Sequence, residues 1–273
     1  MKKIIVATDF SESATNAVIY AADMAGKLDA GIVLLHTYQP YTSASEIPLL
    51  IDTEKEMAKA ANGLRDLRTL LQQRIGSATD IQTRLIQNSF YQGLSTLCEE
   101  INPCLVVMGS QGTSAVERLM AGSQIVHTIQ QLPWPLVTVP PDAIYKDISR
   151  IGLACDLHDV LKIVPAEQLK ELVQLFKAEL HVLNNGPAHC YDPEVVVGSE
   201  TLRLILAPCR PQFHFLASED TEPEIMEFIN SNNIDLLVVM PRHHGLLYKL
   251  THHSSSKYFV LHASVPVLLL HKK

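Results

Sequence analysis

A glycine-rich segment near residue 110 has the residue types and the spacing to bind phosphate. Three glycines are followed by a serine and a glutamine in the pattern G-x2-G-x9-G-S-Q, as Gly109, Gly112, Gly122, Ser123 and Gln124. Glycine lets main-chain amides approach an anion without a Cβ in the way. The last glycine opens a helix predicted over residues 123–131, and a helix start presents unpaired N–H groups and the positive end of its dipole. The segment therefore predicts an anion-binding loop.

The histidines near the carboxyl terminus have the composition of a metal site but not its spacing. They form two adjacent pairs and two single residues, His243, His244, His252, His253, His262 and His271. Neighbouring side chains in an extended loop diverge, and no H-x-x-x-H places two imidazoles on one helical face. Solvated surface histidines are the favoured interpretation and no metal ligand is predicted, with an anion, a partner protein or a metal as the alternatives.

The elements that position the glycine segment alternate between strands and helices. Short apolar runs predict buried strands at residues 3–8, 31–37, 80–86, 104–108 and 135–139. Apolar residues at helical spacing predict helices over residues 12–28 and 52–74, and either Asp9 or Ser11 can cap the first. This alternation indicates right-handed crossovers and a parallel sheet covered on both faces. The glycine segment begins at the carboxyl end of the fourth strand, where ligands bind in open α/β sheets.

The second half of the chain repeats this scheme with a deletion. The segment from Leu153 to Asp156 matches Val6 to Asp9 at an offset of 147, and Met240 matches Met108 at an offset of 132. Because the offset falls along the repeat, the second copy must lack about fifteen residues between its first and fourth strands. We expect the loss in its second helix.

The tandem prolines Pro140 and Pro141 suit a connector between two domains, because proline restricts the backbone and removes an amide donor. We therefore predict an α/β fold with two tandem doubly wound domains, residues 1–141 and 142–273. Each is expected to hold a five-stranded, mostly parallel sheet with helices on both faces.

With these features the chain resembles the universal stress protein family. The spacing of Gly109, Gly112, Gly122 and Ser123 matches that family's ATP-binding signature, and residues 5–13 match its typical first strand and helix start. The resemblance covers the first half and, in strand order and length, much of the second. It implies a tandem universal stress protein with an adenine nucleotide alpha hydrolase-like fold. It also implies ATP, with or without Mg²⁺, as the ligand of the first domain, and a regulatory or interaction role in stress response.

Carried over by position, the resemblance implies a binding site built from three strand ends. Asp9 contacts the nucleoside, and Thr37, with Ala7 nearby, lines the adenine pocket. The phosphates are held by the loop that contains Met108, Gly109, Gly112, Gly122, Ser123 and Gln124. A carboxylate at Asp9 can accept hydrogen bonds from ribose hydroxyls. The structural alternative is that Asp9 only caps a helix and the glycines only form turns.

The second domain departs from the family's pattern. Aligning Met240 with Met108 places Pro241 at the position of Gly109 and His244 near that of Gly112. Proline removes an amide, and histidine adds bulk where the backbone must approach the ligand. We expect this domain to bind nucleotide poorly or not at all and to act as the pairing partner of the first. Residues 136–139 and 267–270 are expected to pair within the chain, with a homodimer as the further option.

Catalysis has little support in the sequence. The patterns of a P-loop, a nucleophile elbow and a zinc protease do not occur. Phosphoryl transfer normally needs a metal ion and a cation, and Arg118 is the nearby cation that the segment offers. No catalytic residue is predicted. A slow Mg²⁺-dependent ATPase and a nucleotide-free scaffold with a histidine-rich second domain are the alternative functions.

Composition limits the class of protein. The 273 residues are 47% hydrophobic and 19% charged, with a net charge of −7, which excludes a disordered chain and argues against nucleic acid or an anionic membrane as a partner. No apolar run approaches the ~20 residues of a membrane span. The five cysteines contain no CxxC, and Cys98 and Cys104 are interpreted as buried apolar groups. We expect a cytoplasmic protein whose partners are an adenine nucleotide and an unidentified protein.

Overall fold

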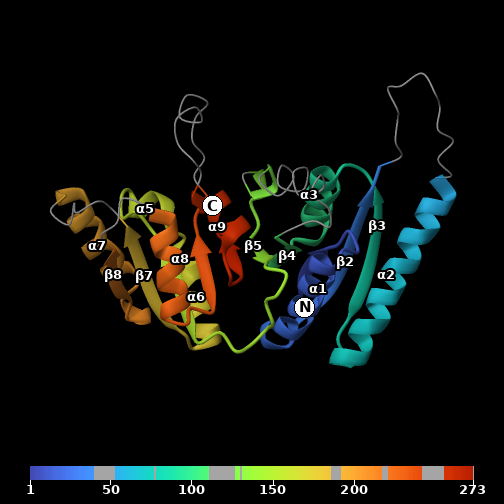
Figure 1. Cartoon of the computed structure of the whole chain (residues 1–273), viewed down its shortest axis with the longest axis horizontal. Helices are drawn as coiled ribbons and strands as arrows, with labels where there is room; N and C mark the ends of the chain where they lie inside the picture. Colours follow the sequence, from blue (N-terminus) through green and yellow to red (C-terminus); the bar gives the residue numbers. More distant parts are fainter. Residues whose placement is uncertain are drawn as a thin grey trace, which may run out of the picture. The chain divides into compact units, whose positions relative to one another are not determined.

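The computed structural model describes residues 1–39, 53–76, 78–110, 127–129, 131–185, 192–216, 221–241 and 255–272. The chain divides into two compact units, Met1–Thr128 and Ile129–Lys273 (Figure 1). Each unit is described by itself below.

The first unit alternates strands and helices as the sequence predicts. Its described elements are β1 (Lys2–Ala7), α1 (Glu12–Leu28), β2 (Ala30–Tyr38), α2 (Thr53–Ile75), β3 (Ile81–Gln87), α3 (Phe90–Ile101) and β4 (Leu105–Gly109). The four strands run parallel in the order β3-β2-β1-β4. Every predicted strand and helix in this list begins and ends within one residue of the observed element.

The helices of the first unit cover both faces of its sheet. Successive crossovers from β1 to β2 and from β2 to β3 move in one direction, so α1 and α2 share a face and contact each other. The crossover from β3 to β4 moves back across the sheet, which places α3 on the opposite face, against β1 and β2. The strand order therefore reverses between β1 and β4, and a ligand crevice is expected at their carboxyl ends.

Ser11 caps the first helix. Its Oγ accepts a hydrogen bond from the amide of Ala14 at 3.0 Å, which satisfies one of the unpaired donors of the first turn. Asp9, the other predicted cap, instead accepts from the amide of Ser11 at 2.9 Å. Glu12 in the first turn and Lys27 in the last turn complement the helix dipole. The capping prediction is thus settled in favour of Ser11, which leaves Asp9 in the preceding turn.

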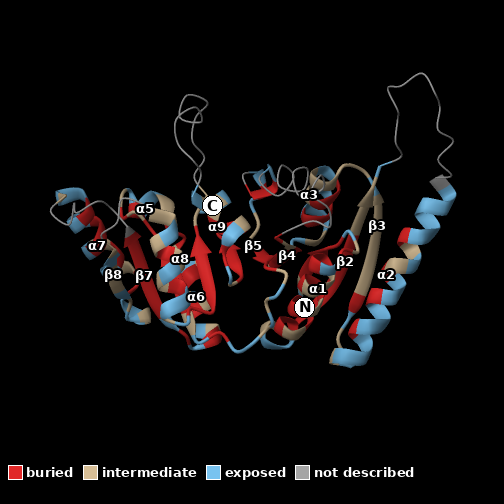
Figure 2. Cartoon of the chain, viewed as in Figure 1, coloured by how far each residue is buried: buried red, intermediate tan, exposed pale blue. Residues whose placement is uncertain are grey.

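Six of the described strands lie in the second unit. Its strands are β5 (Leu136–Val139), β6 (Arg150–Ala154), β7 (Glu179–Asn185), β8 (Gln212–Leu216), β9 (Leu236–Val239) and β10 (Val267–Leu269), in the order β5-β10-β9-β6-β7-β8. Its described helices are α5 (Val160–Ile163), α6 (Ala166–Phe176), α7 (Pro193–Ile205), the 3₁₀ turn Ala207–Cys209, α8 (Thr221–Ser231) and α9 (Ser255–His262). Buried residues follow the strands of each unit, whereas exposed residues cover the outer face of α2 (Figure 2).

The last strand of the first repeat belongs to the compact second unit. β5 runs antiparallel to β10, with Val137 opposite Leu268, and this is the pairing that the sequence predicts for residues 136–139 and 267–270. The hydroxyl of the buried Thr138 also donates to the carbonyl of Val267 at 3.4 Å. The two compact units therefore meet after residue 128. The sequence repeat, which we propose as residues 1–141 and 142–273, instead assigns β5 to the first copy.

The two copies place non-glycine residues in the left-handed backbone region at matching positions. The three pairs are Phe10 and Leu157 after the first strand, Asp29 and Lys177 after the following helix, and Asn102 and Asn233 before the fourth strand. Residues other than glycine seldom adopt this conformation, so three matched pairs are strong evidence that the chain follows the same path twice. The structure thereby supports the tandem repeat independently of sequence similarity.

The deletion in the second copy lies between its second and third strands. The sheet registers match Leu34 with Val182, an offset of 148, and Thr83 with Phe213, an offset of 130. The second helix accounts for much of this loss, because α2 has 23 residues and α7 has 13. The predicted location of the deletion is confirmed.

One detail of the predicted alignment is wrong by a residue. Val6 pairs with Val107 and its counterpart Leu153 pairs with Val238, an offset of 131 for the fourth strand. Met240, not Pro241, therefore stands at the position of Gly109, and Pro241 stands at that of Ser110. Both strands contain Val-Val-Met, and matching these letters shifts the alignment by one residue. The second copy still lacks a glycine at this strand end.

None of the helices among the described residues has the length and hydropathy of a membrane-spanning segment. The same part of the chain contains no group of three or more His, Cys, Asp or Glu side chains arranged to hold a metal ion.

Candidate functional site

Three predicted site residues lie together at the carboxyl ends of the two central strands of the first unit. Ala7 ends β1, and Met108 and Gly109 end β4. The register pairs Val6 with Val107, so Ala7 and Met108 lie side by side, and both are buried. These strand ends flank the point where the strand order reverses. The sheet thus brings the end of β1 and the start of the glycine segment to one edge.

Asp9 lies in a tight turn that joins β1 to α1. The hydroxyl of Thr8 accepts from the amide of Phe10 at 3.0 Å, and Oδ1 of Asp9 accepts from the amide of Ser11 at 2.9 Å. Phe10 has a φ of 65°, which bulky side chains rarely adopt. Asp9 is exposed, and its Oδ2 accepts no hydrogen bond from the described residues. The turn therefore holds one carboxylate oxygen and leaves the other exposed.

Thr37 stands near the end of β2, next to this turn. The paired register of β1 and β2 ends at Ala7 and Leu35, so Thr37 lies two residues beyond it. Its side chain packs toward α3, where a Cβ added to Gly93 would lie 2.8 Å from the Thr37 methyl carbon. The main chain of Thr37 therefore has no strand partner from β1.

His36 is an additional residue of this region, which the sequence did not single out as functional. Its Nδ1 lies 2.7 Å from the main-chain oxygen of Thr8, and its ring packs on that of Phe10 with centroids 4.4 Å apart. These contacts join the end of β2 to the residues on both sides of Asp9. Comparison of the two halves could have identified His36, because the second copy makes a matching contact, which is described below.

Gly109 requires the absence of a side chain because β4 approaches the first turn of α1 closely. A Cβ at this position would lie 2.8 Å from Oγ of Ser13 and 3.1 Å from its main-chain carbon and oxygen. The Ser13 hydroxyl is buried and has no hydrogen-bond partner among the described residues. Gly109 therefore serves backbone packing as well as any ligand approach, and an unsatisfied hydroxyl lies directly beside the start of the glycine segment.

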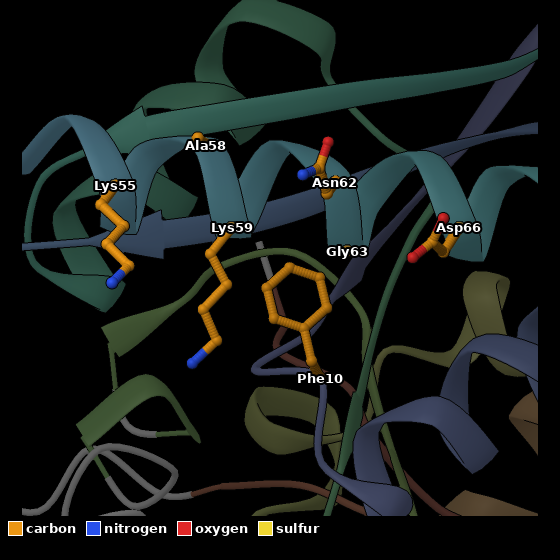
Figure 3. A pocket seen from close by; sticks show the side chains of 7 residues that line it. All are labelled: Phe10, Lys55, Ala58, Lys59, Asn62, Gly63 and Asp66. Carbon is orange, nitrogen blue, oxygen red and sulfur yellow. The ribbon is translucent and has the colours of Figure 1, made fainter.

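A hollow of about 530 Å³ lies beside Phe10 along the first half of α2 (Figure 3). Its lining consists of one aromatic ring and six residues of the helix, Phe10, Lys55, Ala58, Lys59, Asn62, Gly63 and Asp66. The side chains of Lys55 and Lys59 extend from the helix toward the side on which Phe10 lies (Figure 3). Sequence reasoning did not find this hollow, because only the fold brings α2 to the turn that follows β1.

The remaining predicted phosphate-loop residues, Gly112, Gly122, Ser123 and Gln124, lie outside the described residues. So do Arg118 and the histidine pairs at 243–244 and 252–253. Of the other two histidines, His262 contacts the carbonyl of Tyr258 at 2.9 Å through Nδ1, and His271 is 9% exposed.

Of the two thiols of the first unit, Cys98 is buried, as its interpretation as an apolar group requires, whereas Cys104 is half-buried. Burial raises the pKa of the Cys98 thiol to about 12, with a further contribution from Glu99. Burial also raises the pKa of Cys104, whose thiol donates to the carbonyl of Lys3 at 3.3 Å. Thiolates are the reactive form of cysteine, so neither side chain is a candidate nucleophile.

Comparison with known proteins identifies the family and the fold. The family model of the Universal stress protein family matches residues 1–140 and 211–271, so the chain belongs to that family. A universal stress protein from Archaeoglobus fulgidus DSM 4304 has a TM-score of 0.73 at 16% identity, over 99% of this chain and 98% of its own. A putative universal stress protein from Pseudomonas aeruginosa UCBPP-PA14 has a TM-score of 0.60 at 14% identity, over 99% and 93%.

A universal stress protein solved in complex with cAMP matches at 23% identity with a TM-score of 0.40, over 50% of this chain and 96% of its own. A comparison with curated protein sequences finds no match. The two full-length structural matches show that the fold is that of the universal stress proteins.

Proposed function

We propose that the first copy of this universal stress protein binds ATP and that the second copy does not. The observation that carries the proposal is the convergence of the Asp9 turn and Gly109 at the point where the strand order reverses. A carboxylate that suits ribose hydroxyls and a glycine that opens a phosphate-binding loop then lie at adjacent strand ends. The second copy has Met240 at the equivalent of Gly109.

In this proposal each described residue has a definite part. Oδ2 of Asp9 accepts from the nucleoside, and the main chain of Thr37 borders the base, with Ala7 beneath. The main chain from Met108 onward leads into the loop that binds the phosphates, with Gly112, Gly122, Ser123 and Gln124. A Mg²⁺ ion would enter with the nucleotide and offset the charge of the phosphates.

We infer a regulatory or interaction role in stress response in place of a catalytic one. The described strand ends contribute a carboxylate, small residues and main chain, but phosphoryl transfer also needs a positioned nucleophile and charge neutralisation. The four described cysteines that are free thiols suit a reducing, cytoplasmic compartment. The nucleotide would act by binding two conformations of the protein with different affinities, and the better-bound one would meet a partner protein.

The test of this function is titration calorimetry with ATP, with and without Mg²⁺, on wild type and two matched variants. Asp9→Asn keeps Oδ1, the acceptor of the Ser11 amide, but replaces the free oxygen by a donor. Because a hydrogen bond to a charged group contributes about 1.5–3 kcal/mol, the Kd for ATP should rise about tenfold to a hundredfold.

Asp156→Asn is the control, since Asp156 accepts from the amide of His158 at 3.1 Å in the same turn of the second copy. It should leave the Kd unchanged. Gly122→Asp, which adds a carboxylate to the proposed phosphate loop, should abolish binding. A wild-type protein that does not bind millimolar ATP would refute the proposal. Phosphate release by wild type that Gly122→Asp lacks would assign a slow ATPase instead.

A further inference from the structure

His36 contacts the residues on both sides of Asp9. Its Nδ1 lies 2.7 Å from the main-chain oxygen of Thr8. A carbonyl oxygen can only accept, so Nδ1 carries a proton and donates, which makes Nε2 the acceptor nitrogen of the neutral ring. On the other side of Asp9, the ring of Phe10 packs on the imidazole with centroids 4.4 Å apart and planes inclined by 34°. One side chain on β2 therefore fixes both neighbours of Asp9.

The turn that His36 supports has little freedom of its own. The Thr8 hydroxyl and the Asp9 carboxylate already accept the amides of Phe10 and Ser11. Phe10 also holds a left-handed φ of 65°. Backbone of this kind persists when the surroundings hold it, and here those surroundings include His36. Loss of the His36 contacts should therefore loosen the turn and change the direction of the Asp9 carboxylate.

The second copy builds the same support from a different side chain. The sheet register matches His36 with Asn184, and Nδ2 of Asn184 donates to the carbonyl of Cys155 at 3.0 Å. Cys155 is the counterpart of Thr8, and Leu157, the counterpart of Phe10, has a φ of 64°. Asparagine can therefore make this contact on the same backbone. The imidazole differs from it by adding a ring that packs on Phe10.

We propose that His36 is a positioning residue of the nucleotide site, which sets the direction of the Asp9 carboxylate by holding Thr8 and Phe10. This inference rests on the proposed function for its ligand. It also predicts a property of the ligand-free protein, because contacts within the protein order the turn.

The experiment compares His36→Ala with His36→Asn in the full-length protein. His36→Ala removes the donor to Thr8 and the ring against Phe10, and the Kd for ATP should rise about fivefold to tenfold, as expected for one lost hydrogen bond. His36→Asn should restore most of the affinity, because an asparagine amide can donate to Thr8 as Asn184 donates to Cys155. Equal affinity of wild type and His36→Ala, or failure of His36→Asn to recover it, would overturn the proposal.

The matched control is Asn184→Ala, which removes the same hydrogen bond from the second copy. It should lower the free energy of unfolding and leave the Kd for ATP unchanged. An equal rise of the Kd in Asn184→Ala and His36→Ala would show a general loss of stability and contradict positioning.

Hydrogen exchange of the Ser11 amide, measured without nucleotide, separates this proposal from the proposed function. That amide donates to Asp9, so its exchange should accelerate about tenfold or more in His36→Ala and return toward wild type in His36→Asn. Unchanged exchange in His36→Ala would refute positioning even if ATP binds. Accelerated exchange in His36→Ala, together with a wild-type protein that does not bind ATP, would support the positioning role of His36 and refute ATP as the ligand.

Discussion

At the scale of single residues, Asp235 shows how the two copies diverged at one strand start. Its counterpart Cys104 donates its amide to Lys3 at 2.9 Å, and Asp235 donates its amide to Arg150 at the same distance. The Asp235 carboxylate also accepts from the amide and hydroxyl of Ser149, each at 2.8 Å, and pairs with Lys146 at 2.8 Å. A buried carboxylate therefore holds the residues before β6 against the start of β9.

This cluster predicts a pH-dependent contribution to stability. Burial of Asp235 raises its pKa, but the hydrogen bonds from Lys146, Ser149 and the Arg150 amide outweigh burial and lower it below the ordinary value. A lowered pKa stabilises the fold above the unfolded value of about 3.9, and this contribution is lost as the pH falls through the folded value. At pH 7 Asp235→Asn should lower the free energy of unfolding by about 2 kcal/mol.

Urea unfolding of wild type and Asp235→Asn from pH 7 down to pH 3 measures this effect. The difference between the two proteins should be constant above about pH 5 and should shrink below about pH 4. Asp159→Asn, at an exposed pair with Lys162, is the control and should change little at any pH. A difference that stays constant down to pH 3 would contradict the assigned role of Asp235.

At the scale of elements, the second helix of each copy packs against the residue after the first strand, whose backbone has a left-handed conformation. Gly63 of α2 faces the ring of Phe10, with 2.8 Å between an added Cβ and Cε1 (Figure 3). Gly198 of α7 faces the main chain of Leu157, with only 1.8 Å between an added Cβ and the carbonyl oxygen. The same helix and turn therefore meet twice, but with different tolerance for a side chain.

This difference predicts unequal effects of the same substitution. In Gly63→Ala the Phe10 ring can shift, so we expect a loss of about 1 kcal/mol in the free energy of unfolding. In Gly198→Ala the helix itself must move away from Leu157, so we expect a loss of about 3 kcal/mol or more. Denaturant unfolding measures both variants, and Gly26→Ala, where an added Cβ has no neighbour within 4 Å, is the control. Equal losses in Gly63→Ala and Gly198→Ala would contradict this packing.

Strands and helices could be predicted from the sequence where a local pattern of apolar residues determines them. Contacts between elements that are distant in the sequence could not be predicted. The strands are apolar throughout because both faces of the sheet are covered, so β1 and β4 are visible in the sequence. The ends of these strands place Asp9 and Gly109 correctly, although their role in binding stays a prediction. The contact between His36 and Thr8 and the hollow beside Lys59 depend on packing across 28 or more residues. No local pattern encodes such contacts.

At the scale of the whole molecule, one chain holds two copies of a fold with unequal strand ends. The first copy has Gly109 at the end of its fourth strand, and the second has Met240 there. Both copies nevertheless keep the aspartate turn, with Asp9 and Asp156 accepting amides two residues ahead. Shared backbone and different strand ends mean that the second copy can serve as an internal reference for ligand effects in the first.

Hydrogen exchange with and without ATP should therefore show protection confined to the first copy. At an ATP concentration of about 100 times the Kd, binding stabilises the nucleotide-binding conformation by about 2.7 kcal/mol. Amide exchange that requires release of the nucleotide should then slow about a hundredfold. We expect this at the amides of residues 8–11, 36–38 and 108–110, and no change at residues 155–158. Because Asp9→Asn weakens binding and Asp156→Asn does not, only Asp9→Asn should reduce the protection at a fixed ATP concentration. Equal protection of residues 155–158 and 8–11 would show that Met240 is compatible with binding and that the second copy also holds nucleotide.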